Sequence, residues 1–157
     1  MNRLEDRIKN YLAGNLSLIE DGLTLVKKEF PLGNADGADG VIDILARDGF
    51  GHYVVIEIKR SDQVARAALH ELTKYTALLK STMGVRPENI RALLLSTAWH
   101  ELGVPFTEYC RVCEVPTQGY ILYANEDGVV SDVKSFVPVE LSEPLTISRQ
   151  QGIFFLF

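Results

Sequence analysis

The stretch VVIEIKR, Val54–Arg60, places a carboxylate and an ammonium inside an otherwise apolar run. Side chains on a strand alternate between its two faces, so Val55, Glu57 and Lys59 share one face. Burying a charge is costly unless the charge is paired or binds a metal. The pattern therefore predicts either an ion pair or a site for chemistry on this face of the strand.

Another carboxylate, Asp43, lies in a second apolar run, VIDIL. Asp48-Gly49 predicts a tight hairpin between the two runs, which would bring Asp43 and Glu57 onto neighbouring antiparallel strands. Two carboxylates that close repel each other unless a cation lies between them, and oxygen ligands suit Mg²⁺ or Mn²⁺. We interpret Asp43 and Glu57 as metal ligands, with the backbone carbonyl of Ile58 as a candidate third ligand.

Lys59 on the same face would contact water or a phosphate rather than the metal. An ammonium there can orient an attacking water and offset negative charge in the transition state. Metal, water and cation together form a site for phosphodiester hydrolysis. The alternative, an ion pair of Lys59 with Asp43 or Glu57 on a solvated sheet face, stays open at this point.

The apolar periodicity predicts the elements that must position these residues. A helix between two strands of one sheet is a crossover, so the strand after it should run parallel to the strand before it. The sequence thus predicts an α/β domain with a mixed sheet. The predicted order is helix (3–19, with a break at Gly14-Asn15), strands (23–30, 41–48, 52–60), helix (62–81) and strand (90–97), then a helix near 107–113 and strands at 120–124, 129–139 and 153–157.

The chain resembles the PD-(D/E)xK nuclease superfamily, and in particular the catalytic domain of NucS/EndoMS-type endonucleases. The resemblance covers about Leu4 to Ser96 and rests on the runs LIEDGLTLVKKEFPLG, GVIDILARDGFGHYVVIEIKR and ALHELTKY. It implies a restriction-endonuclease-like core of helix, three-strand meander, helix and strand, within a single nuclease-like domain over 1–157. The core would span about 4–96, and a C-terminal β-rich extension would span 97–157.

The resemblance also implies roles for individual residues. Asp43 and Glu57 become metal ligands and Lys59 the catalytic lysine. Family members tend to carry an acidic residue in the first helix, for which Glu5 and Glu20 are the candidates.

The chain departs from the family where a Gln-Leu-x-Arg-Tyr element often follows the lysine. The matching run here is ELTKY, which places Glu71 at the glutamine position and Tyr75 one helical turn later. Both residues are accessory candidates for the site, and an ordinary Glu71–Lys74 surface pair is the alternative. The 157 residues hold no segment resembling the N-terminal DNA-binding and dimerisation domain of longer relatives, so the resemblance implies no mismatch specificity.

The formal net charge of −5 argues against a general nucleic-acid coating protein but not against a nuclease, because binding depends on local patches. Lys27 and Lys28 point to opposite faces of a strand, so at most one of them faces the site. DNA is the expected partner, and a homodimer is an arrangement that could cut both strands. The candidate phosphate contacts are Lys28, Arg60, Arg66 and Lys74.

No apolar run approaches the roughly 18–20 residues of a membrane span. The N-terminus is charged and amphipathic, unlike a signal peptide, so we expect a cytoplasmic protein. The Cys110-x-x-Cys113 pair lacks the further ligands of a structural zinc site, and we interpret both residues as thiols in a helix. Trp99 could stack on a base, but packing is the expected role.

These patterns favour an endonuclease that hydrolyses DNA phosphodiester bonds with Mg²⁺ or Mn²⁺. The alternative is a catalytically inactive module of the same fold that binds nucleic acid or a protein.

Overall fold

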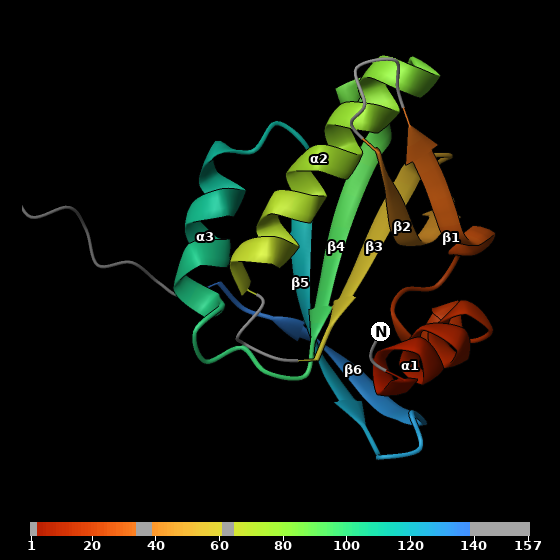
Figure 1. Cartoon of the computed structure of the whole chain (residues 1–157), viewed down its shortest axis with the longest axis vertical. Coiled ribbons are helices and arrows are strands. Elements are labelled where there is room, and N and C mark those ends of the chain that lie inside the picture. The colour runs from red at the N-terminus through yellow and green to blue at the C-terminus, as the bar shows by residue number, and fades with distance from the viewer. Residues whose placement is uncertain (1–2, 34–38, 61–64, 139–157) are drawn as a thin grey trace, which may run out of the picture.

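The computed structural model describes residues 3–33, 39–60 and 65–138 (Figure 1). In these segments, the short 3₁₀ helices η1 (Leu16–Leu18) and η3 (Pro87–Asn89) connect longer elements. The main elements are α1 (Arg3–Ala13), β1 (Thr24–Gly33), β2 (Asp39–Arg47), β3 (Tyr53–Lys59), α2 (Ala65–Met83), β4 (Ile90–Ser96), α3 (Gly103–Val112), β5 (Thr117–Ala124) and β6 (Val130–Phe136).

The strands form one mixed sheet in the order β1-β2-β3-β4-β5-β6. The β1–β2 and β2–β3 pairs are antiparallel, whereas α2 and α3 are crossovers that make β3–β4 and β4–β5 parallel. β6 returns antiparallel to β5. The predicted mixed α/β sheet is therefore confirmed, and the strands after Trp99 extend the same sheet.

The sheet separates two apolar layers. The helices α2 and α3 cover one face of the sheet, and α1 lies on the other (Figure 1). Ile8 and Leu12 of α1 pack with buried residues of β2–β5. β3 and β4 are buried on both sides, as is usual for strands covered by helices on both faces. Glu57 therefore lies in a strand that is shielded from solvent on both faces, where an uncompensated charge is most costly.

The break predicted after the first helical turns occurs at Gly14. α1 ends at Ala13, and the Asn15 side-chain amide donates to the Tyr11 carbonyl at 2.8 Å, which satisfies a free helix C-terminal acceptor. α3 begins at Gly103, earlier than the predicted 107, because the buried Phe106 belongs to its first turn and Thr107 donates to the Gly103 carbonyl at 2.8 Å. The strand predicted at 153–157 lies outside the described residues. Within the described segments, no helix is long and apolar enough to cross a membrane.

Candidate active site

Asp43 and Glu57 lie together where β2 and β3 leave their regular ladder, whose last registered pair is Ile44–Ile56. Beyond that pair, the Ile58 backbone N–H donates to Asp43 Oδ2 at 2.9 Å. The Asp43 backbone N–H donates to Glu57 Oε1 at 3.3 Å. Each carboxylate thus accepts a hydrogen bond from the neighbouring strand, which fixes both at the same corner of the sheet.

The environment of this pair opposes negative charge. Glu57 is 1% exposed, and burial first, then the carboxylates of Asp43 and Glu71, raise the pKa of Glu57 well above its ordinary value. Burial also raises the pKa of Asp43, although the Ile58 N–H and the ammonium of Lys9 oppose the rise. A cation beside the pair would relieve this cost.

Lys59 is the last residue of β3, and its ammonium lies 2.9 Å from Glu71 Oε2 on α2. Burial works against the ammonium, but the Glu71 carboxylate outweighs it and the pKa of Lys59 is raised. Lys59 therefore stays charged. The structure places Glu71 against Lys59, whereas the Lys74 ammonium lies 5.9 Å from the centre of the Tyr75 ring. The expected alternative of a Glu71–Lys74 surface pair does not describe this arrangement.

Tyr75 is buried on the face of α2 that also carries Glu71. A Cβ on Gly40 would collide with the Tyr75 ring, so the glycine allows α2 to approach β2 closely. Burial, followed by the carboxylates of Glu57 and Glu71, raises the pKa of Tyr75. The side chain therefore remains a neutral phenol near the two acidic residues.

The other wall of the site comes from α1. A cavity of about 120 Å³ is lined by residues of α1 together with Asp43 and Ile58. Glu5 Oε1 accepts a hydrogen bond from the Arg60 backbone N–H at 3.3 Å, which ties the first turn of α1 to the end of β3. The α1 residues of this cavity are Glu5, Asp6 and Lys9.

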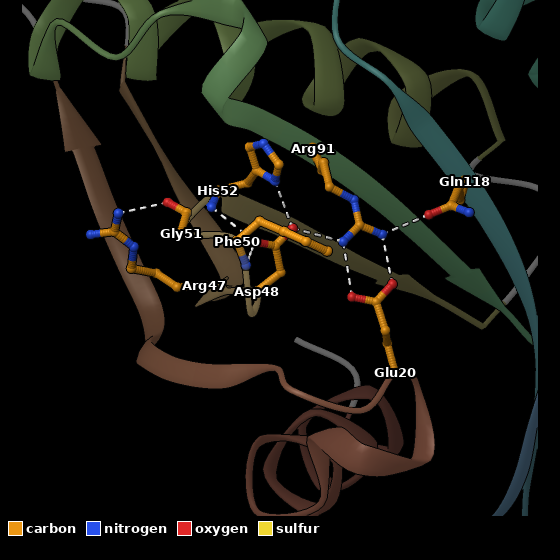
Figure 2. A network of polar contacts seen from close by, with 8 residues as sticks. All are labelled: Glu20, Arg47, Asp48, Phe50, Gly51, His52, Arg91 and Gln118. Atoms are coloured by element: carbon orange, nitrogen blue, oxygen red, sulfur yellow. Dashed lines mark hydrogen bonds and ion pairs between the residues drawn. The ribbon is translucent and has the colours of Figure 1, made fainter.

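The structure places Glu20, the other acidic candidate, away from this corner. Figure 2 shows its carboxylate on Arg91, 2.7 Å away, and Arg91 also contacts Asp48 in the β2–β3 hairpin at 3.0 Å. Arg91 pairs in register with Val54, near the start of β3, whereas the site lies at its end. The prediction for Glu20 is therefore corrected: the break after α1 and η1 carry the chain to the opposite end of the strand.

The candidate phosphate contacts surround the site unevenly. Arg60 directly follows Lys59 and is exposed, and Lys74 is half-buried on α2 beside Tyr75. The Lys28 ammonium donates to Asn10 Oδ1 at 2.5 Å and so faces α1. The side chain of Arg66 lies outside the described part of the structure.

The sequence analysis missed three charged residues at the site, which are Lys9, Asp6 and Glu29. The Lys9 ammonium lies 3.2 Å from Glu29 Oε1, 3.4 Å from Asp6 Oδ1 and 3.7 Å from Asp43 Oδ1. Burial works against its charge, but Asp43 and then Glu29 raise the pKa of Lys9. Lys9 follows Glu5 by four residues, a spacing that could have indicated a shared helical face. No sequence signal places Glu29, because the glycine-rich connection conceals the β1–β2 register.

The residues fit a divalent cation that binds through oxygen. Among residues 3–33, 39–60 and 65–138, no group of three or more His, Cys, Asp or Glu side chains forms a metal cluster. Mg²⁺ keeps several of its waters and binds proteins through one or two carboxylates, and the oxygens of Asp43, Glu57 and the Ile58 carbonyl are ligands of this type.

The remaining candidates for chemistry have structural contacts. Cys110 and Cys113 are free thiols whose sulfurs contact backbone carbonyls, and burial raises the pKa of Cys110 to about 11. Trp99 stacks on Phe136 with ring centres 4.0 Å apart, and its indole N–H donates to the Tyr120 carbonyl at 3.0 Å. These contacts give Trp99 a role in packing.

The fold is similar to that of several solved structures. Relative to the structure of an EndoMS-dsDNA2 complex, the TM-score is 0.53 at 18% identity, over 74% of this chain and 44% of that chain. For a repair endonuclease from Pyrococcus abyssi, the TM-score is 0.54 at 21% identity, over 74% of this chain and 46% of that chain. For an fdxN element excision controlling factor protein from Anabaena variabilis, the TM-score is 0.51 at 16% identity, over 85% of this chain and 99% of that chain. At these identities the likeness concerns the fold alone.

Residues 4–101 match the Endonuclease NucS C-terminal domain, and the chain belongs to this family. Endonuclease NucS from Bifidobacterium adolescentis is 40% identical over 76 residues, 48% of this chain and 30% of the relative. Endonuclease NucS from Corynebacterium glutamicum (strain R) is 33% identical over 84 residues, 54% of this chain and 34% of the relative. The chain thus spans about a third of the length of these relatives. The resemblance to NucS-type endonucleases is confirmed at the level of this domain.

Proposed function

We propose that this chain is a nuclease domain that hydrolyses DNA phosphodiester bonds with Mg²⁺ or Mn²⁺. The observation that carries the proposal is the convergence of Asp43, Glu57 and Lys59 at one corner of the sheet, with Asp43 fixed by the Ile58 N–H at 2.9 Å. Membership of the NucS C-terminal domain family supports the reaction class. The similar fold of a protein solved in complex with DNA, EndoMS-dsDNA2, supports the substrate class.

Asp43, Glu57 and the Ile58 carbonyl would hold the cation, with Glu5 in the surrounding shell. When bound, the cation would polarise the phosphate and make a nearby water more acidic. The hydrogen bonds from Ile58 and Asp43 orient the two carboxylates before the cation arrives, so little reorganisation accompanies binding.

Lys59 supplies a fixed positive charge for the attacking water and for the charge that develops on the phosphate. Glu71 keeps this ammonium charged and in place. The neutral phenol of Tyr75 is a hydrogen-bond donor on the same face. Arg60 and Lys74 would contact the phosphates on either side, and two copies of the chain would cut the two strands.

The test is cleavage of end-labelled single-stranded, duplex, forked and mismatched DNA in Mg²⁺, Mn²⁺ or EDTA. We expect cleavage only with a divalent cation, and a loss of about 100-fold or more in Lys59→Met, the usual size for removing one transition-state contact. Lys134→Gln is the matched control, because Lys134 is 64% exposed on β6. Cleavage in EDTA, or a fully active Lys59→Met protein, would contradict the proposal.

A second candidate is a module of this fold that binds nucleic acid or a protein without cutting. The ion pairs Lys9–Asp43 and Lys59–Glu71 favour it, because they neutralise site carboxylates without any metal. This candidate predicts no cleavage of any substrate and no heat of Mn²⁺ binding by titration calorimetry.

A further inference from the structure

Lys9 projects from α1 into the acidic side of the candidate metal site. Its side chain is 11% exposed, and its ammonium contacts three carboxylates from three different elements. Asp43 is the only one of these three that the proposed function makes a metal ligand. On the α1 side of the site, Asp43 is therefore paired with the ammonium of Lys9.

Glu29 takes part in this contact at a conformational cost. It lies between the registered pairs Lys28–Ile44 and Phe30–Ile42, which places it beside Asp43 across the β1–β2 ladder. Its φ of 54° is in the left-handed region, which side chains adopt rarely and at an energetic cost. Glu29 is 3.2 Å from the Lys9 ammonium in this conformation.

We propose that Lys9 is a resident counter-cation of the site, which a divalent metal must displace from Asp43 and which thereby sets the metal affinity. The inference rests on the proposed function, because it takes Asp43 as a metal ligand. A lysine side chain is long and flexible, so the ammonium can leave Asp43 while staying near Asp6 and Glu29. Those two carboxylates would hold the displaced charge close to the metal and keep the affinity moderate.

The experiment is titration calorimetry of Mn²⁺ into the whole chain, with wild type, Lys9→Gln, Lys9→Arg and Lys134→Gln compared at one pH and ionic strength. Removing one unit of like charge a few ångströms from the metal should lower the dissociation constant of Lys9→Gln about tenfold. Lys9→Arg keeps the charge and should stay within about twofold of wild type. Lys134→Gln breaks a solvent-exposed 3.8 Å ion pair and should change nothing.

A thermal-unfolding series with increasing Mn²⁺ gives a second measurement that does not depend on activity. Mn²⁺ should raise the melting temperature of Lys9→Gln more than that of wild type, because tighter binding stabilises the native state more at equal concentration. If Lys9→Gln does not fold, Lys9→Met makes the same comparison with an unbranched apolar side chain.

Unchanged or weaker Mn²⁺ binding in Lys9→Gln and Lys9→Met would overturn the inference while leaving the proposed nuclease intact. No Mn²⁺ binding by any protein would overturn both. Tighter binding in Lys9→Gln, combined with absence of cleavage in every substrate, would support the counter-cation and reject the proposed activity.

Discussion

At the scale of single residues, the site is made of side chains that also complete the hydrogen bonding of the sheet. Asp43 accepts the Ile58 N–H, and Glu57 accepts the Asp43 N–H, where the β2–β3 ladder stops. Glu57 does so inside a strand that is buried on both faces. Burial and the carboxylates of Asp43 and Glu71 raise the pKa of Glu57, so its ionised form is disfavoured there unless a positive charge compensates it.

Glu29 offers a test of backbone strain at this scale. In an ordinary strand, alanine is more stabilising than glycine, but at a φ of 54° the Cβ is the source of the strain. We expect Glu29→Gly to exceed Glu29→Ala in unfolding free energy by about 1 kcal/mol. Both variants lose the contact with Lys9, so their difference isolates the backbone term.

Urea unfolding of the two Glu29 variants measures this difference. The same pair of substitutions at Lys27, on the same strand, is the control, and there alanine should be equal or better. A Glu29→Ala protein as stable as Glu29→Gly would show that the left-handed conformation carries no strain.

At the scale of elements, the β2–β3 hairpin fixes where Asp43 and Glu57 meet, and Asp48 fixes the hairpin. The buried Asp48 carboxylate accepts the backbone N–H groups of Phe50 and His52 at 2.9 Å each. Its other oxygen contacts the His52 ring at 2.8 Å and Arg91 at 3.0 Å (Figure 2). Burial alone would raise the pKa of Asp48, but these contacts outweigh it and hold the pKa well below its ordinary value.

The lowered pKa gives the pH dependence of this element. A carboxyl whose folded pKa is depressed contributes stability that is present above its unfolded pKa of about 4 and is lost as the pH falls below it. Asp48→Asn replaces one oxygen by an amide nitrogen that cannot accept from Arg91. We expect a loss of about 2 kcal/mol in unfolding free energy at pH 7, and a smaller difference from wild type below about pH 4.

Urea titrations at pH 7, 5 and 3.5 measure that difference. Asp132→Asn is the matched control, because Asp132 is 52% exposed and its ion pair with Lys134 should contribute little. An Asp48→Asn deficit that is constant over this range would contradict the assignment to the carboxylate charge.

At the scale of the whole molecule, the proposed function requires an acidic protein to bind a polyanion. The net charge is −5, and the acidic residues Glu5, Asp6, Glu29, Asp43, Glu57 and Glu71 gather around one corner. Repulsion from this corner opposes DNA binding, and a divalent cation held there would reduce the negative charge of the corner.

We therefore expect binding of the Lys59→Met protein to labelled duplex DNA to be at least about tenfold tighter in Mn²⁺ than in EDTA, because this variant removes cleavage while keeping both carboxylates. Fluorescence anisotropy at constant ionic strength measures the two affinities. Asp43→Asn should abolish the difference. Equal affinity in Mn²⁺ and EDTA would mean that DNA binding does not depend on a cation at the acidic corner.

The sequence by itself determined most of the elements up to β4 and the shared face of Glu57 and Lys59. Alternation along VVIEIKR predicted Glu57 and Lys59 on one face, and the Asp-Gly turn predicted Asp43 on the neighbouring antiparallel strand, although it did not fix the register between them. The crossover rule determined that β4 would run parallel to β3. These features are local or follow from chain connectivity, so a single sequence carries them.

Tertiary structure decided which residues from distant elements complete the corner. The packing of α1 on the sheet places Glu5 in the same cavity as Asp43, whereas the path of the chain after Gly14 places Glu20 against Arg91. No local pattern distinguishes these two acids. The docking of α2 against Gly40 puts Glu71 on Lys59 rather than on Lys74. The Lys9–Glu29 contact depends on the angle of α1 over the sheet and on the β1–β2 register. Both are set by the packing of buried apolar surfaces, which a one-dimensional pattern does not specify.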